Sequence, residues 1–347
     1  MTLVQCVNMV TASVLLSLFF LSGALADCSL EPDLFITAPQ KMEALRGSCL
    51  QIPCTFSANP EKGFNSSRAS SGVWIKNDYR FQLNPNNVIF NGTGSVNKYA
   101  ANITGNPSQK NCTTLFSSLT TADTDSYFFF LIFIPDTNRI VCFLWCKMSV
   151  CCFTTDSAPS PRIHISGDVK ENESVGITCS AVSPCPQSPP TLTWAVPHES
   201  QNKLEQNIDG TFTVKIQENI TLSDKHDGRS ISCSAKYPVN EGTAVSPAED
   251  KVTLSVSYTP KDTSASISPP GGVSAGTQVN LTCSSRANPP ISHFTWFKQI
   301  TGGSINVSEG DVYGFNATDE GVYFCMATND LGDQTSPTIR LNLNGKY

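Results

Sequence analysis

The sequence has no concentrated positive charge. Its 23 basic residues are outnumbered by 29 acidic ones, the formal net charge is −6, and the basic residues form no tract. Nucleic acids and anionic lipid surfaces attract proteins through clustered Lys and Arg, so neither is expected as a partner. An acidic ligand would need a local cation in its binding site.

Histidine is also scarce, and the four histidines lie in separate segments, at His164, His198, His226 and His293. No Gly-rich phosphate loop or nucleophile elbow accompanies them. An enzyme needs its base, its nucleophile and their orienting groups in one constellation. We therefore expect no enzymatic activity and no cofactor.

No stretch of about 20 apolar residues, the length of a membrane-spanning helix, follows the N-terminal region. Residues 1–26 contain an apolar run that ends in Ala24-Leu25-Ala26, which is typical of a secretory signal peptide. The best later candidate for a membrane span, Phe128–Phe153, is interrupted by Pro135–Arg139 and by Lys147. We expect no membrane span, and a chain that is secreted or is the extracellular part of a plasma-membrane receptor.

Cysteines and glycosylation sequons are abundant. Of the 14 cysteines, all but Cys6 follow the leader, and nine Asn-x-Ser/Thr sequons lie beyond it with no Pro at x. Together they indicate an oxidising, glycosylating compartment, and hence an extracellular chain. The expected N-glycosylation sites are Asn65, Asn91, Asn102, Asn111, Asn172, Asn219, Asn280, Asn306 and Asn316.

Short alternating runs take the place of helical periodicity, for example at residues 252–256 and 339–343. At about 100 residues per sandwich, the length allows three domains. We predict an all-β protein of three tandem immunoglobulin-like β-sandwiches, V-type then two C2-type. The predicted segments are a signal peptide at 1–26, a V-type domain at 27–156, and C2-type domains at 157–258 and 259–347, with Pro-containing turns at 157–162 and 258–261 as boundaries.

The immunoglobulin core needs two cysteines, a tryptophan between them and a tyrosine corner two residues before the second cysteine. The last third supplies Cys283, Trp296, Tyr323 and Cys325, and the middle third supplies Cys179, Trp194 and Cys233, with Ile231 at the corner position. These triplets predict one bridge between the sheets in each of the two domains.

The first domain departs from this pattern. It has Cys54, Trp74 and the corner Tyr127, but Phe129 stands where the second cysteine belongs. The ordinary bridge is therefore impossible. Cys112 lies on what would be the strand before the corner, and a bridge from Cys54 to Cys112 would join two strands of the same sheet.

Five further motifs stand out in the sequence: Leu45–Phe56 (LRGSCLQIPCTF), Gly72–Asn77 (GVWIKN), Asn111–Leu115 (NCTTL), Tyr127–Phe129 (YFF) and Ser183–Pro190 (SPCPQSPP). Together they resemble the sialic-acid-binding immunoglobulin-like lectins, or Siglecs. The resemblance covers nearly the whole mature chain except about residues 131–156. It implies a V-type first domain with an intra-sheet bridge, Cys54 with Cys112, and a bridge from the first domain to the second, Cys49 with Cys185.

The resemblance also implies a sialic acid site on the exposed face of the first domain. The family holds the sugar carboxylate with an Arg three residues after the corner tyrosine, and the matching residue here is Phe130. Strand alternation places Phe128 and Phe130 outward. The family also stacks an aromatic near the start of its first strand on the sugar, and the matching residues are Leu34 and Phe35, the latter also a candidate for the core. Without a guanidinium fork we expect weak or absent sialic acid binding.

Two other features of the first domain remain open. Arg139 is a candidate substitute cation, but it lies in a predicted turn. The apolar runs within 128–153 predict a hairpin, and they are either a protein-binding patch or an atypical segment that impairs the domain. Cys142, Cys146, Cys151 and Cys152 have poor zinc spacing, so no metal is expected, and with Cys28 they leave an odd number of cysteines outside the four bridges.

The sequence therefore favours a Siglec-like extracellular recognition protein in cell adhesion or immune-cell regulation. Its partner is either a sialylated cell-surface glycan or a cell-surface protein. A third hypothesis is a non-binding soluble variant of a longer receptor.

Overall fold

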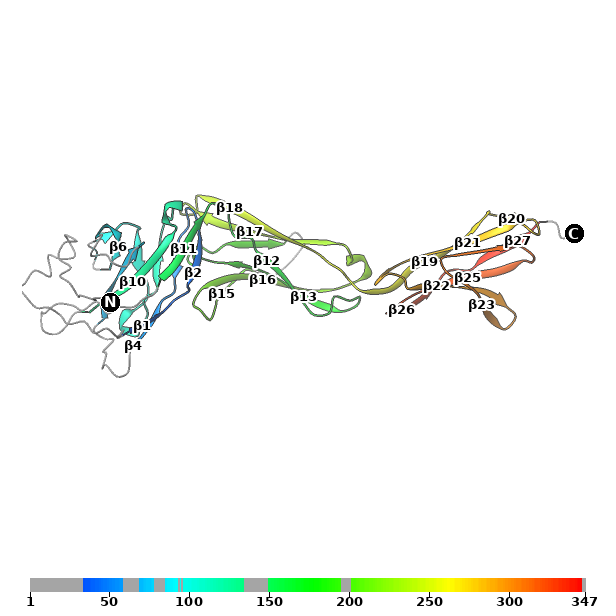
Figure 1. The fold of residues 1–347 in the computed structure, drawn as a ribbon, viewed down its shortest axis with the longest axis horizontal. Helices are drawn as coiled ribbons and strands as arrows, with labels where there is room; N and C mark the ends of the chain where they lie inside the picture. The colour runs from blue at the N-terminus through cyan, green and yellow to red at the C-terminus, as the bar shows by residue number, and fades with distance from the viewer. Residues whose placement is uncertain are drawn as a thin grey trace, which may run out of the picture. The chain divides into compact units, whose positions relative to one another are not determined.

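The computed structural model describes residues 34–58, 69–77, 85–92, 94, 96–133, 149–194 and 201–344. The predicted signal peptide, together with Cys28, Asn65, Arg139, Cys142 and Cys146, lies outside these residues. Strands make up nearly all of the regular secondary structure of the described part, which confirms the all-β class (Figure 1). Its only helices are short 3-10 turns, so no helix among the described residues has the length to cross a bilayer.

The first domain packs a large sheet against smaller ones. Its elements are β1 (Leu34–Thr37), β2 (Lys41–Leu45), β3 (Leu50–Ile52), β4 (Thr55–Ala58), β5 (Ala69–Lys76), η3 (Pro85–Asn87), β6 (Val88–Asn91), β7 (Val96–Asn97), β8 (Ala101–Ile103), η4 (Pro107–Gln109), β9 (Thr114–Phe116), η5 (Thr121–Asp123), β10 (Asp125–Phe133) and β11 (Ser149–Thr155). The sheets have the orders β2-β11-β10-β5-β6-β7, β3-β9-β8 and β1-β4. The last strand of this domain in the sequence, β11, lies between β2 and β10 in the large sheet, and Cys152 on β11 is buried in the core.

Aromatic rings fill the space of the missing inter-sheet bridge. The Phe129 ring lies 5.0 Å from Trp74, and the Trp74 ring meets Phe116 edge-on at 5.4 Å. Gly72 on the neighbouring strand makes room for Phe129, since a Cβ there would lie 2.2 Å from its Cζ atom. The Tyr127 hydroxyl donates to the Asp123 carbonyl, which forms the predicted tyrosine corner.

The structure contains the four bridges that the motifs and the resemblance imply. They are Cys49–Cys185, Cys54–Cys112, Cys179–Cys233 and Cys283–Cys325. Cys54 follows β3 and Cys112 precedes β9, and these two strands are neighbours in one sheet. The amide of Cys112 also donates to the carbonyl of Cys54 at 2.8 Å. This bridge therefore links two strands of the same sheet.

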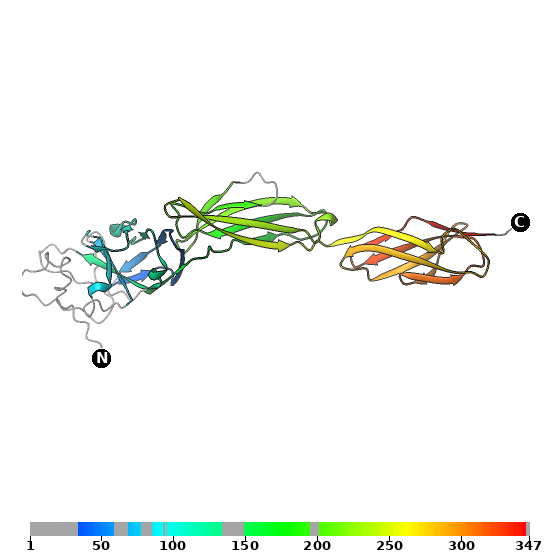
Figure 2. The ribbon, with the colours of Figure 1, turned by 90° about the horizontal axis from the view of Figure 1, so that it is seen from above.

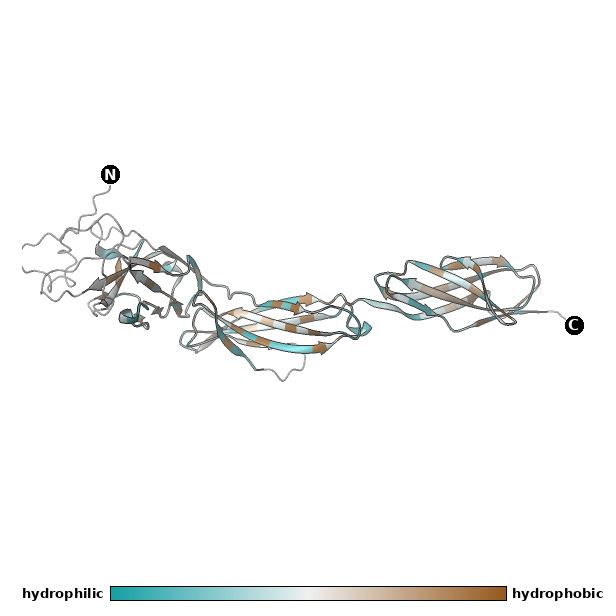
Figure 3. Cartoon of the chain, turned by 90° about the horizontal axis from the view of Figure 1, so that it is seen from below, coloured by the Kyte–Doolittle hydropathy of each residue, from teal (hydrophilic) through white to brown (hydrophobic). Residues whose placement is uncertain are grey.

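The second domain consists of β12 (Arg162–Ser166), β13 (Ser174–Val182), β14 (Thr191–Trp194), β15 (Lys203–Gln206), β16 (Phe212–Thr221), η6 (Asp224–His226), β17 (Ser230–Val239) and β18 (Ala244–Thr253). Its sheets, β12-β13-β16-β15 and β14-β17-β18, have the strand arrangement of constant-type immunoglobulin domains. Buried residues alternate with more exposed ones along β13 and β17. Hydrophobic and hydrophilic residues accordingly alternate along the strands in Figure 3.

The third domain consists of β19 (Tyr258–Ser268), β20 (Gly272–Val273), β21 (Gln278–Asn288), β22 (His293–Ile300), β23 (Gly303–Glu309), β24 (Val312–Asn316), β25 (Gly321–Asn329), β26 (Gly332–Thr335) and β27 (Ile339–Leu343). Its sheets are β19-β21-β24 and β20-β27-β25-β22-β23, with β26 paired to β25 (Figure 2, yellow to red). The prediction of a boundary turn at 258–261 is wrong, because Pro260 lies inside β19. The edge position of β19 and a register shift between Tyr258 and Lys261 accommodate it.

The chain divides into two compact units. One unit comprises Met1–His164, Thr178–Gln217 and Ser232–Asp250, and the other comprises Ile165–Ile177, Glu218–Ile231 and Lys251–Tyr347. The division runs through the second sandwich and follows neither predicted boundary. The three-domain division of the sequence therefore stays a prediction.

Within the second compact unit, polar contacts join the third sandwich to the part of the second sandwich that belongs to the same unit. Arg286 on β21 donates through Nε to Asp262 at 2.6 Å and through its terminal nitrogen to Asp224 in η6. Lys261 forms an ion pair with Glu171 at 3.0 Å. These contacts join elements on both sides of the segment between β18 and β19.

Candidate functional site

The expected sugar-binding position lies in the middle of the large sheet of the first domain. Phe130 on β10 pairs directly with Val73 on β5, and Phe128 pairs with Ile75. Tyr127, Phe129 and Leu131 belong to the core between the sheets, whereas Phe130 does not. The predicted alternation is therefore correct, and Phe130 is on the sheet face away from that core.

That face is nevertheless covered at Phe130, although the resemblance implies an exposed sugar-binding face at this position. Phe130 and Val73 are each 3% exposed, and Ile75 is 2% exposed. Val88, opposite Ile75 on β6, is also buried. The physical reason is the run of apolar residues on both sides of these strands, which fits a strand buried on both faces.

The other predicted contacts are not brought together with Phe130. Phe128 is half-buried and lies two residues from Phe130 along β10. The backbones of Leu34 and Phe35 lie in β1, which pairs with β4 in a separate two-stranded sheet. The structure thus divides the four predicted ligand residues between two sheets.

Two basic side chains of the first domain are engaged away from this face. Lys76 lies opposite Tyr127, on the core side of β5, and donates to the Ala122 carbonyl at 2.5 Å. Arg46 forms an exposed ion pair with Asp156 at 3.1 Å. Neither replaces the guanidinium fork that the resemblance implies at residue 130.

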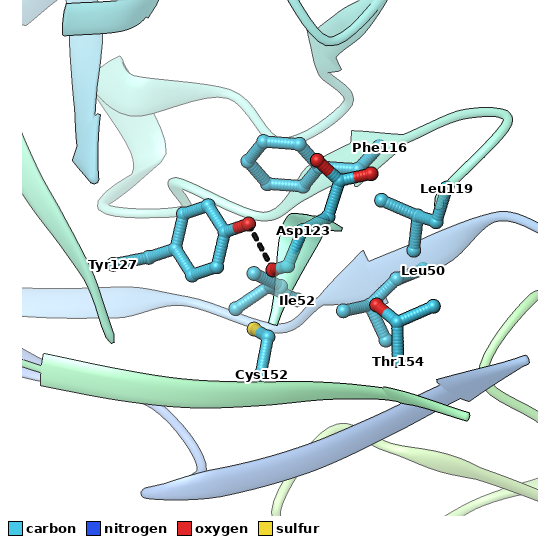
Figure 4. A pocket seen from close by; sticks show the side chains of 8 residues that line it. All are labelled: Leu50, Ile52, Phe116, Leu119, Asp123, Tyr127, Cys152 and Thr154. Carbon is cyan, nitrogen blue, oxygen red and sulfur yellow. Dashed lines mark hydrogen bonds between the residues drawn. The ribbon is translucent and has the colours of Figure 1, made fainter. Parts of the chain in front are cut away.

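A small cavity lies near the tyrosine corner of the first domain (Figure 4). Its lining is mostly apolar and includes Leu50, Phe116 and Cys152. The Asp123 carboxylate at its edge already accepts hydrogen bonds from the amide and hydroxyl of Thr120, at 2.6 and 2.9 Å. Burial raises the pKa of Tyr127 far above its usual value. These groups serve packing and the corner, and we assign no ligand to the cavity.

The first two sandwiches meet around the Cys49–Cys185 bridge. The amide of Gln51 donates to the Pro184 carbonyl at 2.8 Å, and the amide of Asn240 donates to the Gly47 carbonyl at 2.7 Å. Gly47 has φ +76°, and a Cβ there would lie 2.5 Å from the Asn240 side chain. The family resemblance implied the bridge, but no sequence signal indicated the contact with Asn240.

The predicted glycosylation sites differ in accessibility. Exposed sites are Asn102, Asn172, Asn219, Asn280, Asn306 and Asn316. Asn111 is half-buried, and its side-chain oxygen accepts from the amide of Thr113 at 3.0 Å. Asn91 is fully buried, opposite Val73. A bulky hydrated sugar does not fit a buried position, so the burial of Asn91 argues against the predicted glycan at this residue.

Comparison with known proteins agrees with the immunoglobulin-like architecture. Residues 261–343 match the model of the immunoglobulin domain. The chain is 23% identical over 332 residues to sialic acid-binding Ig-like lectin 12 of Homo sapiens, and 24% identical over 320 residues to myelin-associated glycoprotein of Rattus norvegicus. This chain resembles the Siglecs. The similarity confirms the family resemblance that its cysteine and tryptophan motifs predict.

The Siglec-like similarity covers most of this chain but only part of each relative. The two matches cover 90% and 88% of the chain and 53% and 47% of the relatives, so the chain spans about half their length. Cell adhesion molecule 3 of Mus musculus is 27% identical over 185 residues, which is 51% of this chain and 44% of that protein. Two of these relatives are a lectin and a cell adhesion molecule, and neither is an enzyme.

Proposed function

We propose that this chain is a Siglec-like extracellular recognition protein, acting in cell adhesion or immune-cell regulation, in which sialic acid is not the ligand. The observation that carries the proposal is the buried Phe130 at the position where the resemblance implies a sugar-binding Arg. The similarity to lectins and adhesion molecules supports the recognition role.

Residue 130 matters for sialic acid binding because of the chemistry of the sugar. A sialic acid presents a carboxylate, which two parallel guanidinium donors match in both charge and geometry. Charge-assisted hydrogen bonds contribute about 1.5–3 kcal/mol each. The phenylalanine ring supplies no donor and no charge, and at 3% exposure it offers a sugar almost no surface.

A cell-surface protein is accordingly the proposed partner. The Cys49–Cys185 bridge closes the junction between the first two sandwiches. A covalent tie of this kind limits the movement of one sandwich against the other, so the first sandwich would meet the partner in a fixed orientation. The non-binding soluble variant is the competing hypothesis, and the same experiment separates the two.

The test is binding of the multimerised chain, freed of its own sialic acids, to a panel of immune and neural cells. Parallel cell samples are treated with sialidase, with protease, or with neither. We expect binding that protease abolishes and sialidase leaves unchanged. Loss of binding after sialidase alone would contradict the proposal, and absence of binding to every cell type would favour the non-binding variant.

A further inference from the structure

Two phenylalanines form a stack on the outer face of the large sheet of the third domain. Phe297 on β22 lies opposite Phe324 on β25, with ring centroids 5.1 Å apart and planes 14° apart. Their chain neighbours Trp296 and Cys325 are fully buried in the core. Alternation therefore turns both phenylalanine rings away from the core. On the outer face of the sheet both rings are half-buried.

Asn306 on β23 completes a row of three cross-strand neighbours with these rings. It pairs with Phe297 on the side away from β25, after a register shift between Trp296 and Phe297. Val307 packs against the core, so the preceding Asn306 side chain is on the outer face, and it is exposed. The row on that face is thus Phe324, Phe297 and Asn306.

Asn306 also begins the sequon Asn306-Val307-Ser308. Side chains directly opposite each other on adjacent strands have Cβ atoms about 4.5–5.5 Å apart, so the first sugar on Asn306 is within reach of the Phe297 ring. N-acetylglucosamine has an apolar face of C–H groups. The negative face of an aromatic ring attracts such groups, and contact removes both surfaces from water.

We propose that the N-glycan on Asn306 folds back over the Phe297–Phe324 stack, with its first N-acetylglucosamine packed on Phe297. The glycan then acts as a structural part of the third domain. It covers aromatic surface that would otherwise face solvent. This inference goes beyond the proposed recognition function and depends only on the glycosylation of Asn306.

The other exposed sequons of the same domain provide matched controls. Asn280 lies opposite Gly314 and Ser268, and Asn316 lies opposite Gln278. Neither pairs with an aromatic residue in the sheet β19-β21-β24. A glycan on Asn280 or Asn316 therefore lacks the ring that Asn306 has beside it.

The experiment compares hydrogen exchange in the full glycosylated chain, with every glycan trimmed to its first sugar. Asn306→Gln should speed exchange of amides in β22 and β23 several-fold, and should lower the melting temperature of the third domain by about 4 °C. Asn280→Gln and Asn316→Gln should change neither. In a Phe297→Leu background, which keeps an apolar side chain, Asn306→Gln should have no further effect.

Four results would overturn the proposal. The first is an Asn306 that peptide mass spectrometry finds without a glycan, and the second is an Asn306→Gln variant that behaves like the two control variants. The third is an effect of Asn306→Gln that is equally large in the native and Phe297→Leu backgrounds. The fourth is self-association of the glycosylated chain that only Phe297→Leu abolishes, which would assign the stack to a second copy instead.

Discussion

Cys49 and Cys185 are bonded across 136 residues of sequence, and beside them Gln51 donates to Pro184 and Asn240 donates to Gly47. One covalent bond and two backbone hydrogen bonds thus hold the end of the first sandwich to the second. This junction limits the movement of the first sandwich against the second.

Removing the bridge should loosen this junction. For Cys49→Ser with Cys185→Ser, we expect a loss of about 2–4 kcal/mol in the free energy of unfolding, because the unfolded chain gains conformational freedom. Amide exchange at Gln51 and Asn240 should rise, while exchange in the third domain should not. Non-reducing peptide mapping of the native chain provides the control, and a Cys49 that is not linked to Cys185 would contradict the junction.

The packing of Phe129 over Gly72 makes a second prediction. Gly72→Ala places a methyl group where the Phe129 ring lies, so we expect a loss of about 1–3 kcal/mol in the free energy of unfolding, measured by urea unfolding of the full chain. Gly303→Ala is the matched control, because a Cβ at Gly303 meets no atom within 4 Å. Equal stability of the two variants would show that Phe129 does not replace the inter-sheet bridge in the way described.

Restoring an arginine at residue 130 should not restore sugar binding. Phe130→Arg introduces a charge at a position 3% exposed, opposite Val73, so we expect a loss of about 3 kcal/mol or more and no sialoside binding. Phe130→Leu, which stays apolar, should cost less. Hydrogen exchange of β5 and β10 peptides reports both variants. A stable Phe130→Arg protein that binds sialosides would contradict the burial of this face.

Much of the fold follows from the spacing of a few residues. The cysteine, tryptophan and tyrosine positions indicated the sandwich cores, because these groups must meet across two sheets. The accessibility of Phe130 did not follow from alternation, because alternation gives the face on which a side chain lies but not whether that face is covered. The place of Pro260 inside β19 was missed as well, since it depends on an edge strand and a register shift that only the pairing shows.

Asn91 shows the same limit for modification sites. A sequon gives the chemistry of glycosylation but not the accessibility of the asparagine. Because Asn91 is fully buried opposite Val73, we expect it to carry no glycan in the folded secreted chain, whereas exposed Asn102 in the same domain should be occupied. Glycopeptide mass spectrometry measures both, and a high occupancy at Asn91 would require a different arrangement of β5 and β6.

The Arg286 contact should make the second compact unit sensitive to acid. The hydrogen bond from Arg286 holds the pKa of Asp224 below its usual value. A carboxylate with a lowered pKa stabilises the folded state above its unfolded pKa, and this contribution is lost as the pH falls through the folded value. We expect Arg286→Gln to reduce the dependence of thermal stability on pH below about 4. An unchanged pH profile in that variant would contradict the contact.

The most direct test of the account is the binding of sialyllactose to the intact, desialylated chain. Saturation-transfer NMR measures this binding, with lactose as the matched control. Because Phe130 is buried where the guanidinium would stand, we predict that sialyllactose gives no more signal than lactose. Saturable binding of sialyllactose, with no binding of lactose, would contradict the account.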